Sequence, residues 1–332
     1  MIEVFASQPH YVDHLAPIVV GLGDDAELIV LTDDLVAYAR ASGITRARRG
    51  APRQADGPPV LVAGYRDAAW TSTARRLALI EHGVGQTYAD VSHMAYAGGP
   101  GWERLSLYLS PGPWATAKWH AGYPGLRVVE CGVPKLDQWF LGGAVHGAVD
   151  RPRDAPVTVA VTFHWPCKET VETWPAFDDW ADEIAALAGD TTYRLVGHWH
   201  PRWATVGRNR LDRFYARHGI PVVDVETVLG STDVLVADNT SLLYEFAALD
   251  KPVVCLNAAR WRADVEHGLR FWDLAPGIQG WPGAHPLVGM VDAADELACR
   301  AQRRDALAAA YGATLDGYAT DRAVAALREW AQ

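Results

Sequence analysis

One segment in the second half of the chain limits the possible folds more than any other. Residues 233–256 have the pattern of an apolar strand, a polar turn, a helix and a second apolar strand. The turn contains Asp238, Asn239, Thr240 and Ser241. Hydroxyl side chains can cap a helix there, and free backbone N–H groups with the helix dipole attract anions. Because ligands of open α/β sheets collect at the carboxyl ends of strands, we predict that this turn holds a phosphorylated group.

The composition is that of an ordinary globular protein. The chain has 332 residues, of which 49% are hydrophobic and 21% charged, enough for two cores. Its net charge is −10 and it has no dense Lys/Arg run, so nucleic acid is a possible but not a favoured partner. Its four cysteines lack metal-type spacing: Cys131, Cys167, Cys255 and Cys299. We therefore expect no metal, and free buried thiols in a reducing compartment.

Neither a signal peptide nor a transmembrane segment is expected. The chain opens with a strand-like run, Ile2–Ala6, without a basic region before it. No apolar run reaches the roughly 20 residues that a spanning helix needs. These observations predict a cytoplasmic protein.

Short apolar runs alternate with amphipathic stretches in both halves. Strands are expected at 2–6, 27–31, 60–63, 77–81, 105–109 and 127–130, then at 157–162, 193–197, 222–224, 234–237 and 253–256. Helices are expected at 11–20, 33–42, 66–74 and 114–119, then at 176–188, 211–217 and 240–249, with two or three closing helices over 292–331. The apolar runs are too continuous for strands with one wet face, which favours parallel sheets covered on both faces.

A Gly- and Pro-rich stretch at 141–156 is expected to link two domains. We place an N-terminal Rossmann-like domain at 1–145, a C-terminal Rossmann-like domain at 146–310 and a closing helix at 311–332. The predicted class is therefore α/β, with two doubly wound parallel sheets that face a central cleft.

The turn after the expected strand at 77–80 is one candidate for chemistry. It contains His82, Gly83, Gly85 and Gln86. A histidine can act as a base near neutral pH, and glycines let a ligand approach closely. A polar turn capped by a histidine explains the pattern equally well.

The turn after the expected strand at 193–196 is a second candidate, with His198, His200 and Arg202. Histidine and arginine can bind phosphate or stabilise a leaving group. The two histidines could also suggest a metal, but no third ligand has a recognisable spacing. A phosphate-facing turn is favoured over a solvent-exposed loop, and both are favoured over a metal site.

Three weaker candidates remain. His10, Asp13 and His14 share about one face of the first expected helix, where they could meet an acceptor, although capping and solvated roles are favoured. Thr162 and His164 end the first strand of the second half and would point into the cleft, unless aromatic packing explains them. For the turn Cys131–Asp137 a structural role is favoured.

Several nucleotide and hydrolase signatures are absent. No GxGxxG follows the first strand, and there is no Walker A motif, no GxSxG elbow and no Asp-x-Asp metal motif.

Taken in order, these motifs resemble the CDP-glycerol glycerophosphotransferase family of teichoic-acid polymerases and primases, which has the GT-B architecture. The motifs that carry the resemblance are His82-Gly83, Gly132–Asp137, Thr162–Trp165, His200-Pro201, Asp238–Ser241, Lys251-Pro252, Glu266–Phe271 and Pro276-Gly277.

The resemblance implies a metal-independent transferase without a cofactor. It would move a glycosyl or glycerophosphate-type group from a nucleotide-diphosphate-activated donor to an acceptor hydroxyl. His82 would be the base, His200 would contact the diphosphate, and Glu245 could touch the ribose. Thr240 and Ser241 would bind the phosphates. We add as donor-side candidates Thr162, His198, Arg202, Asp238 and Asn239, and as acceptor-side candidates His10, Gly83, Gly85 and Gln86.

Two departures from the family pattern keep other substrates open. The family's lysine before Pro-His-Pro is missing, and no basic amphipathic element for a membrane surface is evident. One alternative is a nucleotide-sugar glycosyltransferase with a non-teichoic acceptor, including modified DNA. Another is an isomerase like the UDP-sugar 2-epimerases, which needs acid/base carboxylates, and few follow the first-half strands beyond Glu81. A silent binding module would require the His82 and His200 turns to be incidental.

Overall fold

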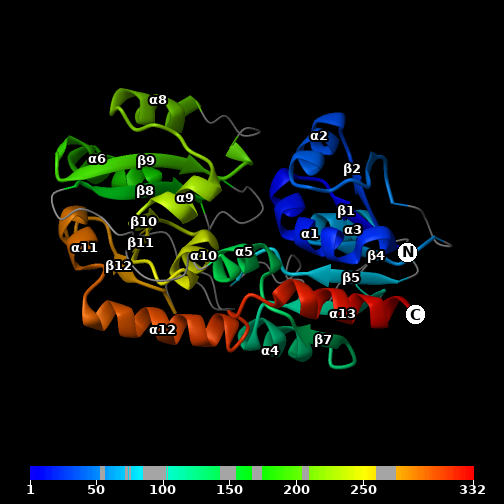
Figure 1. Cartoon of the computed structure of the whole chain (residues 1–332). Helices are drawn as coiled ribbons and strands as arrows, with labels where there is room; N and C mark the ends of the chain where they lie inside the picture. Colours follow the sequence, from blue (N-terminus) through cyan, green and yellow to red (C-terminus); the bar gives the residue numbers. More distant parts are fainter. Residues whose placement is uncertain are drawn as a thin grey trace. The chain divides into compact units, whose positions relative to one another are not determined.

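The computed structural model describes residues 1–52, 57–71, 74, 76–84, 102, 104–142, 155–166, 174–203, 209–258 and 274–332. The chain forms two compact units (Figure 1). The first comprises Met1–Val84, Val91–Gly142 and Ala309–Gln332, and the second comprises Gly85–Asp90 and Gly143–Ala308. The chain thus returns to the first unit near the end of a long helix, α12 (Leu297–Tyr311).

The first unit contains a parallel sheet in the order β3-β2-β1-β4-β5-β6-β7. The strands are β1 (Ile2–Ala6), β2 (Ala26–Val30), β3 (Ala47–Arg49), β4 (Val60–Val62), β5 (Leu77–Ile80), β6 (Leu105–Ser110) and β7 (Arg127–Glu130). Alternate residues of each strand face the same side. Ile2, Val4 and Ala6 accordingly join one apolar core with α1 (Pro9–Leu22) and α13 (Ala319–Ala331).

The remaining helices of the first unit follow the βα alternation. They are η1 (Gly23–Asp25), α2 (Asp33–Ala41), α3 (Tyr65–Trp70), α4 (Pro113–Gly122), η4 (Pro134–Leu136) and α5 (Asp137–Leu141). Helix α2 starts where its pattern predicts, because the Thr32 side chain accepts a hydrogen bond from the Leu35 N–H.

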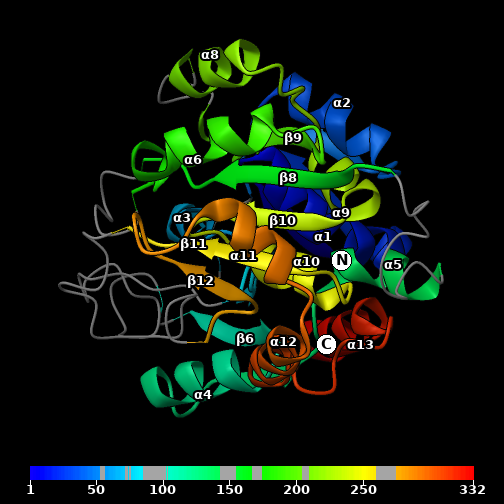
Figure 2. The same ribbon diagram turned by 90° about the vertical axis from the view of Figure 1, so that its left-hand side faces the viewer.

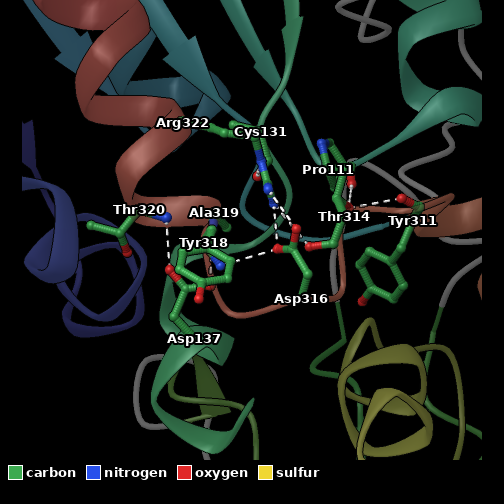
Figure 3. Close-up of polar contacts among 10 residues, drawn as sticks. All are labelled: Pro111, Cys131, Asp137, Tyr311, Thr314, Asp316, Tyr318, Ala319, Thr320 and Arg322. Carbon is green, nitrogen blue, oxygen red and sulfur yellow. Dashed lines mark hydrogen bonds and ion pairs between the residues drawn. The ribbon is translucent and has the colours of Figure 1, made fainter. Parts of the chain in front are cut away.

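A buried carboxylate fixes the start of α13 (Figure 3). Asp137 accepts hydrogen bonds from the Ala319 N–H at 3.1 Å and the Thr320 N–H at 2.7 Å. These are N–H groups that a helix start leaves without an intrahelical partner. Arg322, one turn later, donates to the Cys131 carbonyl at 2.9 Å. The last helix is thereby attached to the loop that follows β7.

The second unit contains a five-stranded parallel sheet in the order β12-β11-β10-β8-β9. The strands are β8 (Val157–Phe163), β9 (Tyr193–Trp199), β10 (Val234–Ala237), β11 (Val253–Leu256) and β12 (Ile278–Gly280). The helices are α6 (Phe177–Gly189), α8 (Asn209–Arg217), α9 (Val225–Ser231), α10 (Leu242–Ala248), α11 (Leu287–Ala293) and α12. Helices α6 and α11 pack against each other and lie side by side in Figure 2.

The predicted α/β class with two parallel sheets is confirmed, and several details differ. Residues 222–224 are not a strand: Val222 makes one isolated bridge to Gly197, and Asp224 caps α9 by accepting the Thr227 N–H at 2.8 Å. The short strands β3 and β12 were not predicted. Within the described part of the chain, no helix has the length and apolar character that crossing a bilayer requires.

Each sheet has a point where the chain order reverses. In the first unit it lies between β1 and β4, and in the second between β8 and β10. Neighbouring connections leave such a pair of strands in opposite directions, so the carboxyl ends of the strands are open to ligands there.

Removing the carboxylate that caps α13 tests the attachment of this helix. Asp137→Ala is expected to lower the free energy of unfolding by about 1 to 3 kcal/mol, because two N–H groups lose their acceptor. Urea denaturation of the full chain measures the change. Asp321→Ala, exposed in the first turn of the same helix, is the control and should change stability by about 0.5 kcal/mol or less. Equal losses would assign the effect to helix-terminal charge rather than to these bonds.

Candidate functional site

A cluster of rings surrounds His82 at the reversal point of the first unit. The centroid of its imidazole lies 5.1 Å from that of Tyr11, 5.5 Å from Tyr65, and 6.4 Å from both His10 and His14. Three segments contribute these rings: the first turns of α1, the start of α3 and the turn that follows β5. With Glu81, these residues are called the His82 cluster below.

Local sequence explains how these segments come together. Pro9 occupies the first turn of α1, where its missing N–H costs nothing, so the helix starts directly after β1. The Ser7 N–H donates to Asp67 of α3 at 2.9 Å, which joins the exits of β1 and β4. Gly64 is required beside them, because a Cβ there would lie 2.5 Å from Tyr11 Cζ.

Glu81 is a buried carboxyl group, 3% exposed, next to His82. Its Oε2 accepts hydrogen bonds from the hydroxyls of Tyr65 at 2.7 Å and Tyr108 at 2.9 Å. Its Oε1 lies 3.7 Å from His82 Nδ1. Burial raises the pKa of Glu81 to about 7, against the opposing effect of the two tyrosine hydroxyls.

His14 is shielded from water in the same cluster. Burial, assisted by the nearby charges of Lys135, His82 and His10, holds the pKa of His14 well below its ordinary value. His14 is therefore neutral at physiological pH. It lies one helical turn from His10, which was predicted to lie on the acceptor side.

A second cluster lies at the carboxyl ends of β8 and β9 in the second unit. Thr162 and His198 are register partners, and Thr162 Oγ1 lies 2.9 Å from His198 Nδ1. Further along, the ring centroids of His164 and His200 are 5.7 Å apart. The guanidinium carbon of Arg202 lies 5.0 Å from the centroid of the Trp165 ring. These side chains, called the His200 cluster below, combine cationic and hydroxyl groups on one sheet edge.

The orientation of His200 follows from its own turn. Its Nδ1 accepts the backbone N–H of Arg202 at 3.1 Å. A nitrogen that accepts a hydrogen bond carries no proton, so the neutral ring has its proton on Nε2. Nε2 is thus the nitrogen suited to donate to an oxyanion.

Asp238 organises the turn after β10. Its carboxylate is 1% exposed and accepts the His164 N–H at 2.6 Å and the Ala176 N–H at 2.9 Å. It therefore joins the exit of β8 to the entry of α6. This geometry gives Asp238 a role in positioning residues that were predicted to bind the donor.

The helix start in this turn differs from the expectation. Helix α10 begins at Leu242, and the Ser241 side chain makes no capping hydrogen bond. Thr240 Oγ1 accepts the Leu242 N–H at 3.3 Å instead. Of the two hydroxyls that could cap this helix, that of Thr240 accepts a helix N–H and that of Ser241 does not. Asn239 and Glu245 are buried in the same region.

Other predicted positions have structural roles or lie outside the described residues. Gly83 is buried in the turn after His82. Gly85, Gln86 and the motif Glu266–Phe271 lie outside the described residues. Lys251 donates to the carbonyls of Leu229 and Thr232 and thus stabilises the end of α9.

Sequence reasoning missed Tyr11, Tyr65 and Tyr108. The one signal for Tyr65 is position, since it lies shortly after the end of β4, as His82 lies shortly after the end of β5. Tyr108 lies within β6 and has no such signal. In the described ranges, no group of three or more His, Cys, Asp or Glu side chains could hold a metal ion.

A known protein family matches a segment of the chain that includes β8, β9 and β10 of the second unit. The model of the family CDP-Glycerol:Poly(glycerophosphate) glycerophosphotransferase matches residues 102–261. This segment of the chain is similar to that family. The resemblance inferred from the motifs is thereby confirmed, and no curated protein matches the chain.

Solved structures share the fold along nearly the whole chain. The S. aureus MnaA–UDP structure has 14% identity and a TM-score of 0.63, and covers 99% of this chain and 96% of its own. A putative UDP-N-acetylglucosamine 2-epimerase from Listeria monocytogenes has 12% identity, a TM-score of 0.62 and coverages of 99% and 96%. A variant of the wall teichoic acid polymerase TagF with CDPG has 11% identity, a TM-score of 0.61 and coverages of 99% and 88%. These likenesses confirm the GT-B-like fold.

Neutralising Asp238 tests its organising role. Asp238→Asn is expected to lower the free energy of unfolding by about 1 to 3 kcal/mol, because an amide nitrogen replaces one acceptor of a buried backbone N–H. Urea denaturation measures it, with Asp305→Asn, exposed on α12, as the control. Unchanged stability would contradict the role of this carboxylate in holding the two loops.

The raised pKa of Glu81 predicts a stability that falls as the pH rises. The folded chain holds this proton up to about pH 7, whereas the ordinary value is 4.5. The stability that the protonated form contributes is fully present below the ordinary pKa. It is lost as the pH rises through the pKa of Glu81 in the folded chain. Between pH 5 and pH 8, the free energy of unfolding of the unaltered protein should fall by about 2 to 3 kcal/mol more than that of the Glu81→Gln variant. Urea denaturation at both pH values tests this, and parallel losses would contradict it.

Proposed function

We propose that the protein is a transferase that moves a glycerophosphate-type or glycosyl group from a nucleoside-diphosphate-activated donor to an acceptor hydroxyl. The family match over residues 102–261 carries this proposal. The matched segment contains β8, β9 and β10 and therefore the whole His200 cluster. CDPG in the TagF structure and UDP in the MnaA structure support a nucleotide as the ligand of this fold.

The His200 cluster is the proposed site for the donor's diphosphate. His200 and Arg202 offer N–H donors, and Thr162 offers a hydroxyl, at the end of the sheet where ligands collect. Donors placed in advance around an oxyanion stabilise charge that develops on a leaving group. We propose that these side chains perform this role without a metal ion.

His82 is the proposed base. A neutral imidazole takes the proton of the acceptor hydroxyl while its oxygen forms the new bond. With a CDP-glycerol-type donor, the oxygen attacks the phosphorus that carries the glycerol, and the bond from this phosphorus to the nucleoside monophosphate breaks. With a nucleotide sugar, the oxygen attacks the anomeric carbon and the nucleoside diphosphate leaves.

Ligand binding and turnover separate the two proposed roles. CDP, UDP, GDP, ADP and TDP are screened by thermal shift, followed by CDP-glycerol and common nucleotide sugars. A ligand that binds only the folded state at about 100 times its Kd stabilises by about 2.7 kcal/mol. We expect one nucleotide to raise the melting temperature selectively, with the shift lost in His200→Ala and kept in His82→Ala. Turnover of the matching donor should fall by at least about 100-fold in His82→Ala.

Matched controls are available for both histidines. His285→Ala, exposed in the second unit, should leave the thermal shift unchanged, and His120→Ala, exposed on α4, should leave turnover unchanged. No shift with any nucleotide would overturn the proposed function. Full turnover in His82→Ala would overturn only the assignment of the base.

A second candidate function is 2-epimerisation of a UDP-sugar. Glu81 favours it, since a buried carboxyl group whose pKa is about 7 can exchange a proton near neutral pH. NMR of a UDP-sugar incubated with the protein and no acceptor distinguishes the candidates. A 2-epimer as the product would favour the isomerase, whereas transfer only after an acceptor is added would favour the transferase.

A further inference from the structure

Glu81 is the only carboxylate of the His82 cluster, and its two oxygens have different surroundings. Oε2 accepts two hydroxyl hydrogen bonds, from Tyr65 and Tyr108. Oε1 faces His82 Nδ1 at 3.7 Å, the distance of an ion pair rather than of a hydrogen bond. The carboxyl group therefore cannot turn away from the imidazole without losing one or both hydroxyl bonds.

We propose that Glu81 is the positioning residue of His82: its Oε1 attracts the proton of Nδ1, so that Nε2 is the nitrogen that takes up a proton. The role of that proton in transfer rests on the proposed function, whereas the arrangement of the two side chains does not.

The rings around His82 restrict the imidazole as well. Tyr11 and Tyr65 meet it edge-on, at interplanar angles of 78° and 72°. Tyr65 thus contacts both members of the pair, since its hydroxyl donates to Glu81 and its ring lies beside His82. A base held by packing and by a fixed carboxylate loses little entropy when it meets its substrate.

The charges near the pair also favour this role. The titratable groups around it are His10, Tyr11 and His14 of α1, Tyr65 of α3, Tyr108 of β6 and, beside His14, Lys135 of η4. Lys135 is the cation of this set, since His14 is neutral. Above about pH 7, where Glu81 is ionised, its carboxylate at 3.7 Å stabilises a proton on the imidazole and so keeps His82 able to accept one.

NMR of the full chain with ¹⁵N-labelled histidine tests the proposal without requiring any turnover. The protein has 12 histidines, and the His82→Asn spectrum identifies the His82 signals. We expect neutral His82 to have its proton on Nδ1. In Glu81→Gln the titration midpoint of His82 should fall, because the negative charge that Glu81 carries when ionised, with a pKa of about 7, is lost.

A second set of variants covers the case in which Glu81→Gln fails to fold. Tyr65→Phe and Tyr108→Phe each remove one hydrogen bond to Oε2, which destabilises the carboxylate and should lower the His82 midpoint by a smaller amount. Glu130→Gln, exposed at the end of β7, is the matched control and should leave the midpoint unchanged. An unchanged midpoint in all Glu81 and tyrosine variants, or a proton on Nε2, would overturn the proposal.

Kinetics then separates this proposal from the proposed function. With an active donor, Glu81→Gln should lower kcat with little change in KM, and the acidic limb of the pH–rate profile should move to lower pH with the NMR midpoint. If the midpoint moves but no donor is turned over, the positioning of His82 stands and the proposed function fails. If the donor is turned over, but Glu81→Gln moves neither the acidic limb of the pH–rate profile nor the NMR midpoint of His82, only the positioning role of Glu81 fails.

Discussion

Buried aspartates at the reversal points of the two sheets hold the segments from which the candidate site residues extend. Asp67 accepts the Ser7 N–H in the first unit, and Asp238 accepts the His164 and Ala176 N–H groups in the second. At a reversal point the connections that follow the two strands diverge. The backbone N–H groups just after these strands therefore have no carbonyl acceptor from a neighbouring strand. A carboxylate satisfies these groups without covering the strand ends. Asp67 therefore positions the segment just before His10, and Asp238 positions His164, without needing to touch a ligand.

The two clusters offer different chemistry because their surroundings differ. Around His82 the rings of Tyr11 and Tyr65 pack against the imidazole, and burial brings the pKa of Glu81 to about 7. Such an environment suits proton transfer. Around His200 the side chains are less buried, and Arg202 adds a fixed positive charge. Such an environment suits the binding of an anion whose charge is permanent. This difference between the two clusters fits the proposed reaction, which needs one base and one site for a charged leaving group.

The sequence predicted most of the strands, and its errors have identifiable physical causes. Continuous apolar runs such as Val234–Ala237 fix buried strands locally. Strand β3 carries Arg48, which makes ion pairs with Glu3 and Glu27, so its pattern is not apolar. The attachment of α13 to Asp137 joins residues 182 positions apart, and the hydroxyl of Tyr108 reaches Glu81 across 27. No local pattern contains such contacts, so the histidines could be predicted while the side chains that hold them could not.

The adjacency of Glu81 and His82 makes sense only at the end of a strand. Consecutive strand residues point to opposite faces of a sheet. Glu81 still donates its N–H to the Leu109 carbonyl at 3.2 Å and meets Tyr108 of the neighbouring strand, whereas β5 itself ends at Ile80. Beyond that end the chain is released from the alternation, and His82 can turn toward α1 while its Nδ1 stays near Glu81. If the same two residues lay within β5, their side chains would point to opposite faces of the sheet. The strand end therefore lets a buried carboxylate act on its own neighbour.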